Sequence, residues 1–471
     1  MQQLSVLDNM FLQADSSRTP MHITPVLLYD PSTAPRGALG FDDVLEHFRN
    51  NLNKSPIFRR KLLHTPFGLD PPYWIEDEDF DLEYHVRHNA LPKPGDWRQF
   101  CVLISRLHSQ GLNLGRPLWE AYVIDGLDAI EGLPKGGFAI ALKIHHAAID
   151  GVSGTQIISA LHSLSANDDE QPSADDWQPE NPPSATQLMW RSYKNSFRRP
   201  TAFLGSLGKV IPAISNVNKE TGDKTEFGQK FQTRFNKRVS GRRVSEALRI
   251  DFEHIRQIKN NAPGVTVNDV VVSIVGGGLR RYLGAKGELP EETLLAGAPI
   301  NTRDKDKPGA TGNSISMMRI PLRTDIPDPL QRLHAVNAGA VASKAYAKAI
   351  GVRTMTDILQ SLSPQLLSIG IRAATAELLT ERLPTPLHTM VSNVPGAPVD
   401  LYMRGALLHD ILALGPLVDK AGLFHGVTSV GGSMAITVAS CGDMLPDPEF
   451  YVQCLKDSFE ELCDASNVAR M

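Results

Sequence analysis

The chain has few cysteines and none of the features that commit a sequence to a membrane or to an oxidising compartment. Its 471 residues include only 4 cysteines, and none forms the C-x-x-C pair typical of redox motifs and zinc sites. No uncharged apolar run approaches the roughly 20 residues that span a bilayer, and the first residues lack the pattern of a signal peptide. We therefore expect reduced, mostly buried thiols in a cytoplasmic protein that can meet a membrane only from one side.

An excess of positive charge is also lacking. Lys plus Arg number 48 against 52 Asp plus Glu, a net charge of −4, which argues against a nucleic-acid partner. Hydrophobic residues make up 42% and charged residues 21%, as in ordinary soluble proteins. The length predicts roughly two to three domains.

Composition changes in the middle of the chain. Residues 167–183 are acidic and rich in proline, as in a linker. Short β-branched runs alternate with amphipathic stretches on both sides, which predicts α/β domains at 1–166 and 242–471, joined by a connector at 167–241. Within the connector, Gln187–Val217 interleaves aromatic and basic residues. It is either a surface for an anionic membrane or a connector packed against the protein.

Four local patterns predict individual elements. The apolar run Phe138–Ile144 predicts a buried strand. A capping pattern at Ser153 predicts a helix whose apolar positions run to Leu164, and a second capping pattern at Thr266 predicts a largely buried helix. The sequence Asp-Pro-Glu from residue 447 predicts the start of a C-terminal helix.

The most informative stretch is H-H-x-x-x-D-G, formed by His145, His146, Asp150 and Gly151 at the end of the predicted strand. A neutral imidazole can take a proton from a hydroxyl as that hydroxyl attacks a carbonyl. Adjacent residues on a strand point to opposite faces, so one histidine is expected to face substrate and the other to be structural. A buried histidine pair with no catalytic role is the alternative. The pattern differs from the H-E-x-x-H zinc motif, and we expect no metal.

The motif resembles the signature of CoA-dependent acyltransferases and condensation domains, which share the chloramphenicol-acetyltransferase-like fold. Further motifs, in family order, resemble those of bacterial wax ester synthase/diacylglycerol acyltransferases across nearly the whole chain. These are Leu7-Asp8-Asn9-Met10-Phe11-Leu12, Pro20-Met21-His22-Ile23, Arg116-Pro117-Leu118-Trp119-Glu120, Thr266-Val267-Asn268-Asp269-Val270 and Ser392-Asn393-Val394-Pro395-Gly396.

The resemblance implies two chloramphenicol-acetyltransferase-like α/β domains, each a mixed sheet with helices, with an active-site tunnel at their interface. It implies that His146 is the general base, that Asp150 holds the geometry of the site, and that His145 and Gly151 support it. The expected reaction transfers a long-chain acyl group from acyl-CoA to a long-chain alcohol, with diacylglycerol as a second acceptor. No acyl-enzyme is needed, and the sequence has no G-x-S-x-G nucleophile motif.

Acyl-CoA is then a co-substrate, and no bound cofactor is expected. The expected location is cytoplasmic, with peripheral association with the inner membrane or with lipid inclusions.

Other motif residues are expected to support the site. Asn268 could donate a hydrogen bond to the oxyanion or, like Asp269, serve only as a helix cap. Trp119 is expected to pack below the site. Ser392–Asn393 are expected in a turn near the cleft, and Arg303 is a candidate partner for a carboxylate such as that of the histidine motif.

Two other functions fit parts of the sequence. The first is a condensation or acyltransferase enzyme of the same fold that uses carrier-bound acyl groups, although no carrier-protein segment is recognisable. The second is a catalytically silent protein that binds lipid surfaces through the basic aromatic segment.

Overall fold

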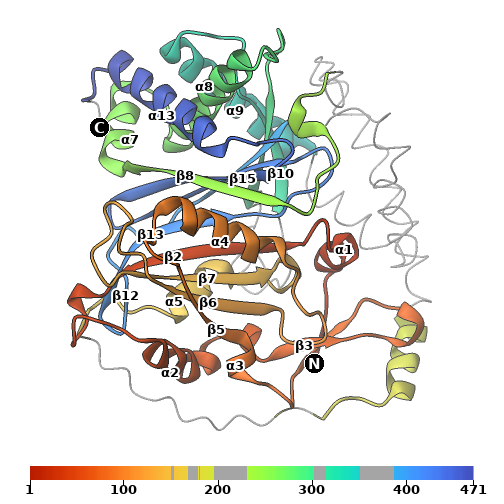
Figure 1. The fold of residues 1–471 in the computed structure, drawn as a ribbon. Coiled ribbons are helices and arrows are strands. Elements are labelled where there is room, and N and C mark those ends of the chain that lie inside the picture. Colours follow the sequence, from red (N-terminus) through yellow and green to blue (C-terminus); the bar gives the residue numbers. More distant parts are fainter. Residues whose placement is uncertain are drawn as a thin grey trace.

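The computed structural model describes residues 1–149, 153–167, 179, 181–195, 231–301, 315–350 and 387–469. Two six-stranded sheets lie one above the other, and a small three-stranded sheet lies beside them (Figure 1). In sheet order, the first six-stranded sheet contains β12 (Tyr402–Met403), β13 (Ala406–Leu414), β2 (His22–Asp30), β7 (Phe138–His145), β6 (Trp119–Asp125) and β5 (Val86–Ala90). The second contains β10 (Ile315–Pro321), β9 (Leu295–Asn301), β11 (Thr389–Val394), β14 (Leu423–Val430), β15 (Ser433–Cys441) and β8 (Arg243–Asp251).

Both large sheets are mixed, as expected. In the first, only β5 and β6 pair in parallel. In the second, β11 runs parallel to both of its neighbours, β9 and β14. The small sheet has the order β1 (Gln2–Gln3), β4 (Tyr73–Glu76), β3 (Arg60–Leu63).

Helices cover the sheets in separate layers. The second sheet carries α7, α8, α9 and α13 on its outer face, whereas α4 lies between the two large sheets (Figure 1). The described α-helices are α1 (Val6–Ala14), α2 (Phe41–Asn51), α3 (Leu82–His85), α4 (Trp97–Ser109), α5 (Ser153–Ala160), α7 (Phe252–Asn261), α8 (Val267–Ala285), α9 (Pro329–Ile350) and α13 (Pro448–Ala465). Within these ranges, no helix is long and apolar enough to cross a membrane.

The strand predicted at 138–144 is β7, and both of its faces are buried. Ala139 and Ala141 belong to an apolar cluster that continues through α4 into the second sheet. Ile140 and Leu142 face the opposite cluster, with α2. All four cysteines are free and buried, as expected from their apolar surroundings.

Two of the predicted helices differ from the structure in where they end or in which apolar residues they bury. The helix from Ser153 ends at Ala160, and Leu164, which was expected to continue its apolar face, is exposed. The C-terminal helix α13 begins at Pro448, as predicted, and buries Cys454 and Phe459, whereas Phe450 on its first turn is exposed.

The C-terminal part of the chain completes the first sheet. Strand β13 pairs with β2, register Leu412 to Val26, although it comes from the predicted C-terminal domain. Because the pairing of β13 with β2 joins the two halves of the chain, the structure does not separate them at residues 166 and 242. These predicted domain boundaries therefore stay a prediction. This exchange holds the start of β2, and the histidine motif beside it, against the second half of the molecule.

Candidate active site

The histidine motif begins where β7 ends. His145 is the last residue of the strand, and its backbone N–H donates to the carbonyl of Leu118 at 2.9 Å. The chain then turns through a short 3₁₀ helix, His146–Ala148. The strand therefore delivers two histidines to one end of the first sheet, where the chain changes direction.

The imidazole of His145 is fully buried, and both of its nitrogens are hydrogen-bonded. Its Nδ1 accepts from the backbone N–H of Ala147 at 3.1 Å. Its Nε2 lies 3.0 Å from Oδ2 of Asp15 and donates to that carboxylate. Both nitrogens are therefore engaged within the protein, and the structural role expected for one of the two histidines stays a prediction for His145.

The imidazole of His146 is placed by backbone and aromatic contacts. The backbone N–H of His146 donates to the backbone carbonyl of Met21 at 2.8 Å, and its ring stacks on Phe11, with centroids 4.0 Å apart. The Nδ1 atom is buried and has no hydrogen-bond partner among the described residues. Burial, assisted by the neighbouring His145, lowers the pKa of His146 to about 4. The ring is therefore neutral at physiological pH and able to accept a proton.

The carboxylate of Asp15 accepts hydrogen bonds from two segments of the site. Oδ2 of Asp15, which follows α1, accepts from His145 and also from the backbone N–H of Met21, at 3.2 Å. Met21 in turn accepts the N–H of His146. The segment from Phe11 to Met21 thus lies against the histidine turn and contacts both histidines.

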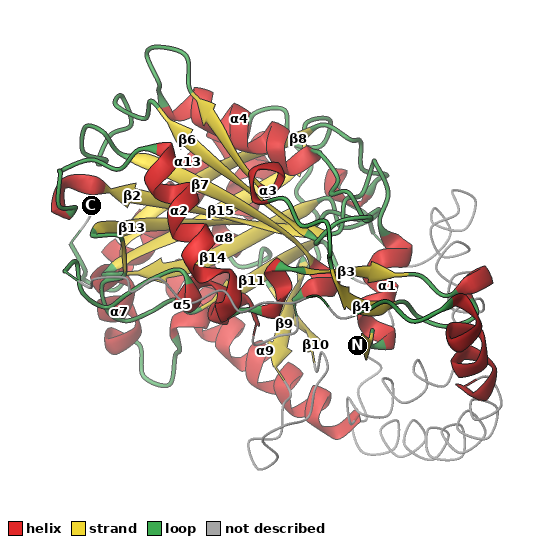
Figure 2. Cartoon of the chain, turned by 90° about the horizontal axis from the view of Figure 1, so that it is seen from below, coloured by secondary structure: helices red, strands yellow, loops and turns green. Residues whose placement is uncertain are grey.

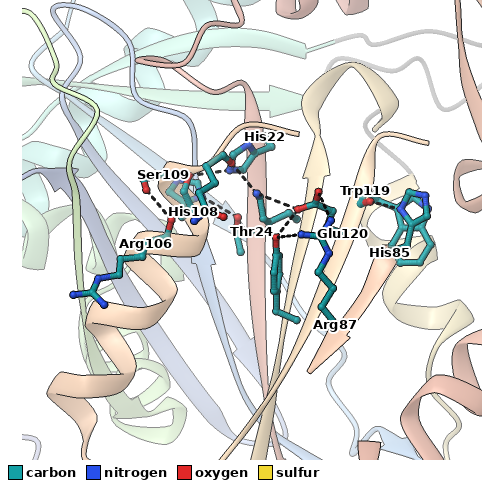
Figure 3. A network of polar contacts seen from close by, with 12 residues as sticks. His22, Thr24, His85, Arg87, Arg106, His108, Ser109, Trp119 and Glu120 are labelled. Atoms are coloured by element: carbon teal, nitrogen blue, oxygen red, sulfur yellow. Dashed lines mark hydrogen bonds and ion pairs between the residues drawn. The ribbon is translucent and has the colours of Figure 1, made fainter. Parts of the chain in front are cut away.

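A buried polar network fixes the start of β2, which directly follows the segment from Phe11 to Met21 (Figure 3). His22 donates from Nε2 to the backbone carbonyl of His108 at 3.0 Å. Thr24 donates to Nδ1 of His108 at 2.8 Å, and Nε2 of that ring donates to the carbonyl of Gly415 at 3.0 Å. These bonds tie β2 and α4 to the chain after β13, so the segment that bears Met21 is anchored to both halves of the protein.

Trp119 is buried in the apolar cluster that also contains Ile144 and Ile149, on either side of the histidines. Its indole N–H donates to the carbonyl of Phe58 at 3.0 Å, and its ring stacks between Phe48 and His85. Its neighbour Leu118 packs against Ala147 in a small apolar cluster. The role of the tryptophan below the site stays a prediction, and its indole N–H is already engaged by Phe58.

The start of α8 separates the roles of Asn268 and Asp269. Thr266 and Asp269 form a reciprocal capping box, in which Oδ2 of Asp269 accepts from the N–H of Thr266 at 2.9 Å. Asn337 donates to the same oxygen. Asn268 takes no part in this cap. Its Oδ1 instead accepts from Nδ2 of Asn393 at 3.4 Å, and its amide N–H groups donate no hydrogen bond within the part of the chain that the structure describes.

Ser392 and Asn393 lie on a strand, which corrects the expected turn. They occupy the end of β11 and pair in parallel with Gly426 and Val427 of β14. The chain leaves the strand only after Val394. Gly396 passes so close to β14 that a Cβ atom there would lie 1.7 Å from the carbonyl oxygen of Ser429, so only glycine fits at the end of this motif.

The structure thus assembles two groups: the two histidines with Phe11 and Asp15, and Asn268 with Asn393. Among the described residues, no hydrogen bond joins one group to the other. Asp150, Gly151 and Arg303 lie outside the described residues, so their roles stay predictions. Across the described ranges, no group of three or more His, Cys, Asp or Glu side chains is arranged to hold a metal ion.

Two family profiles match the chain. The wax ester synthase/diacylglycerol acyltransferase (WS/DGAT) catalytic domain matches residues 4–271, and the WS/DGAT C-terminal domain matches residues 311–463. The chain belongs to the WS/DGAT family. This WS/DGAT protein is therefore an acyltransferase that acts on an acyl-CoA and an acyl acceptor, and the resemblance drawn from its motifs is confirmed.

Relatives and solved structures agree with this assignment. The WS/DGAT chain is 32% identical, over 99% of its length and 91% of the relative's, to a protein of Mycobacterium tuberculosis named "Putative diacyglycerol O-acyltransferase Rv1760". It superposes on the wax ester synthase/diacylglycerol acyltransferase of Marinobacter aquaeolei with a TM-score of 0.71 at 23% identity, covering 99% and 100% of the two chains. The first condensation domain of the calcium-dependent antibiotic synthetase gives a TM-score of 0.58 at 12% identity, covering 99% and 96%. These similarities confirm the expected fold.

Sequence reasoning missed the most direct partners of the WS/DGAT histidines. Phe11 and Met21 stand inside motifs that the sequence analysis singled out, but no role was assigned to either. Asp15 stands between those two motifs. The signal available was that Phe11 and Met21 stand in two motifs close together in the chain, with Asp15 in the segment between them.

Proposed function

We propose that this acyltransferase moves a long-chain acyl group from acyl-CoA to a long-chain alcohol, forming a wax ester, with diacylglycerol as a second acceptor. The observation that supports this most directly is the imidazole of His146, which is neutral, stacks on Phe11, and lies on a turn whose backbone N–H donates to the carbonyl of Met21. A ring in that state is suited to general-base chemistry on a hydroxyl.

In the proposed step, His146 removes the proton of the acceptor hydroxyl while the oxygen attacks the thioester carbonyl. Because Nδ1 is the buried nitrogen, we assign the proton transfer to Nε2. The carbonyl becomes a tetrahedral oxyanion, the carbon–sulfur bond then breaks, and the CoA thiolate takes the proton from the imidazolium. Ester and free CoA thiol leave, and no acyl-enzyme forms.

Asn268 is the candidate donor to the oxyanion. Its Oδ1 is engaged by Asn393, which directs the N–H groups of its amide away from that contact. The capping box relieves it of a structural role at the helix terminus. Oxyanion donors contribute about 2.7–4 kcal/mol where they have been removed from other enzymes.

The test measures thiol release from palmitoyl-CoA with and without hexadecanol, and identifies lipid products by chromatography. We expect alcohol-dependent release and a wax ester with the native chain, and loss of both with His146→Ala. His88→Ala is the control, since His88 is exposed and pairs with Asp125 away from the motif. An ester formed at the native rate by the His146 variant would remove the base from the proposal. No ester with either hexadecanol or a diacylglycerol would instead favour a carrier-bound substrate or a silent lipid-binding protein.

A further inference from the structure

A cavity lies where the two halves of the molecule meet, and none of the family motif residues lines it. It is formed by α4 from the first half and by β8 and the start of α13 from the second, and α4 lies beside β8 in both views (Figures 1 and 2). Its volume of about 270 Å³ is below the roughly 300–1,000 Å³ of sites that enclose a drug-sized ligand. It therefore suits a small group or one end of a larger molecule. Its charged lining residues are Arg98, Arg106, Arg242, Arg243, Glu246 and Glu449.

The carboxylates neutralise only part of the positive charge around the cavity. Glu449 is paired with Arg98. Glu246 is buried, and its carboxylate already accepts from the indole N–H of Trp97 and from the backbone N–H of Ala247. Among the described residues that line the cavity, four arginines face two glutamates, so an excess of positive charge remains.

Arg243 is a buried cation that has no carboxylate partner within the described ranges. Its guanidinium donates to the backbone carbonyl of Ser240 and, from Nη2 at 2.7 Å, to that of Arg18. Both acceptors are neutral, and burial is the main cause of a lowered pKa at Arg243. A buried charge without a counter-ion is costly. An anion in the cavity would offset that cost.

Two exposed guanidinium groups line the same cavity. The side chains of Arg106 and Arg242 make no hydrogen bond or ion pair with any other residue that the structure describes. Figure 3 shows the Arg106 side chain pointing away from the polar network around His108. Arg242 lies close to Gly442, where a Cβ atom would be 2.8 Å from its Nε. The glycine therefore leaves room for the position that Arg242 takes beside the cavity.

The cavity is connected to the histidine turn through Arg243. The carbonyl that accepts from its Nη2 belongs to Arg18, three residues after Asp15 in the chain. Asp15 in turn accepts from His145. An anion bound by Arg243 would therefore lie next to the segment that holds the histidine turn.

We propose that this cavity binds the phosphate group of a small molecule through Arg106, Arg242 and Arg243. A phosphate has enough charge and enough oxygen acceptors for several guanidinium groups, whereas a carboxylate is satisfied by one two-pronged contact. Two sources share this chemistry: the phosphorylated nucleotide end of acyl-CoA and a free phosphate compound. The first source rests on the function proposed above, but the binding of phosphate does not.

Calorimetric titration with inorganic phosphate and with free CoA tests the binding. We expect the native chain to bind at least one of them, and Arg106→Gln/Arg242→Gln to bind it roughly 10-fold more weakly or worse, because two charged donors are lost. Both side chains are exposed, so the double variant should keep the native Tm. Arg49→Gln is the matched control, since Arg49 is an exposed arginine on α2, which packs on the opposite face of the first sheet. Equal binding by the native chain and the double variant overturns the proposal, as does a native chain that binds neither probe.

The two sources are separated by kinetics with palmitoyl-CoA. If acyl-CoA supplies the phosphate, free CoA should bind more tightly than inorganic phosphate, and the double variant should raise KM for palmitoyl-CoA about 10-fold with little change in kcat. If the ligand is a free phosphate compound, KM should stay native although the variant loses phosphate binding. Both results support the site. A native chain that binds phosphate but makes no ester would leave the site intact and refute the proposed function.

Discussion

The phenyl ring of Phe11 lies flat against the imidazole of His146, with the centroids 4.0 Å apart and the planes inclined by 16°. The contact brings a helix from the start of the chain onto a turn more than a hundred residues later. It removes water from one face of the imidazole, and desolvation is the main reason that the pKa of His146 falls to about 4. The same contact fixes the ring plane, so Phe11 is a positioning residue for the proposed base.

Removing the Phe11 ring should therefore change both the rate and its pH dependence. A stacked aromatic pair contributes about 0.5–1.5 kcal/mol, so we expect Phe11→Ala to lower kcat by roughly 2- to 12-fold. Water then reaches the imidazole, and the acid limb of the kcat/KM profile should move upward from about 4 toward the ordinary value of 6.5. Phe11→Tyr keeps the stack and should retain the native profile. An unchanged acid limb in the alanine variant would show that Phe11 does not set the protonation of the base.

Asp15 should act on catalysis through its hold on the histidine turn. Its Oδ2 accepts from His145 and from Met21, the residue that also accepts from His146. Loss of a hydrogen bond to a charged partner in a buried site costs about 1.5–3 kcal/mol. We expect Asp15→Ala to lower kcat and Tm together with little change in KM. Asp15→Asn, which keeps an acceptor oxygen, should recover part of both. A raised KM with a native kcat would place Asp15 in substrate binding instead.

The elements that could be predicted from the sequence are those determined by local patterns. The strand β7 followed from an unbroken apolar run, and α8 from a capping box at Thr266. The prediction that the helix from Ser153 continues to Leu164 was wrong. The helix ends at Ala160, and Ser163 instead pairs with Tyr402 of the first sheet. The turn predicted at Ser392 and Asn393 was wrong because the pairing of β11 with β14 continues through both residues to Val394.

The partners of the histidines could not be predicted, since they depend on long-range folding. Asp15 and His145 are 130 residues apart, and no periodicity connects them. The pairing of β13 with β2 likewise joins strands from opposite halves of the chain. The family motifs located the segments of the site, whereas the contacts between them follow from topology.

The buried histidines should make the protein unstable in mild acid. Burial lowers the pKa of seven histidines, in most of them to about 4 or below. These are His22, His85, His108, His146, His162, His388 and His425. Their folded pKa values lie below the unfolded value of about 6.5, so the unfolded chain binds more protons below that pH. The stability is therefore present above about 6.5 and is lost as the pH falls toward 4.

We expect the midpoint of urea unfolding to fall steadily from pH 7 to pH 5. Each buried histidine contributes up to about 3 kcal/mol over the full range. His425→Gln removes one of these groups and should flatten the dependence. A midpoint that is constant between pH 7 and pH 5 would contradict the assignment of neutral buried imidazoles.

Neighbouring residues at the start of α8 allow catalysis and capping to be separated. Thr266→Ala removes the N-cap and should destabilise the protein by about 1 kcal/mol, with kcat nearly unchanged. Asn268→Ala leaves the capping box of Thr266 and Asp269 intact, so its Tm should stay close to native. If Asn268 donates to the oxyanion, its kcat should fall by about 10²- to 10³-fold with KM little changed.

Asn393→Ala provides the intermediate case, because it removes the donor that orients the Asn268 amide at 3.4 Å without removing the amide itself. Its kcat should fall by less than that of Asn268→Ala, and the double variant should be no slower than Asn268→Ala alone, since both changes act through one hydrogen-bond donor. Additive losses would mean that Asn393 contacts the substrate independently. A large loss of Tm with a native kcat in Asn268→Ala would return that residue to a purely structural role.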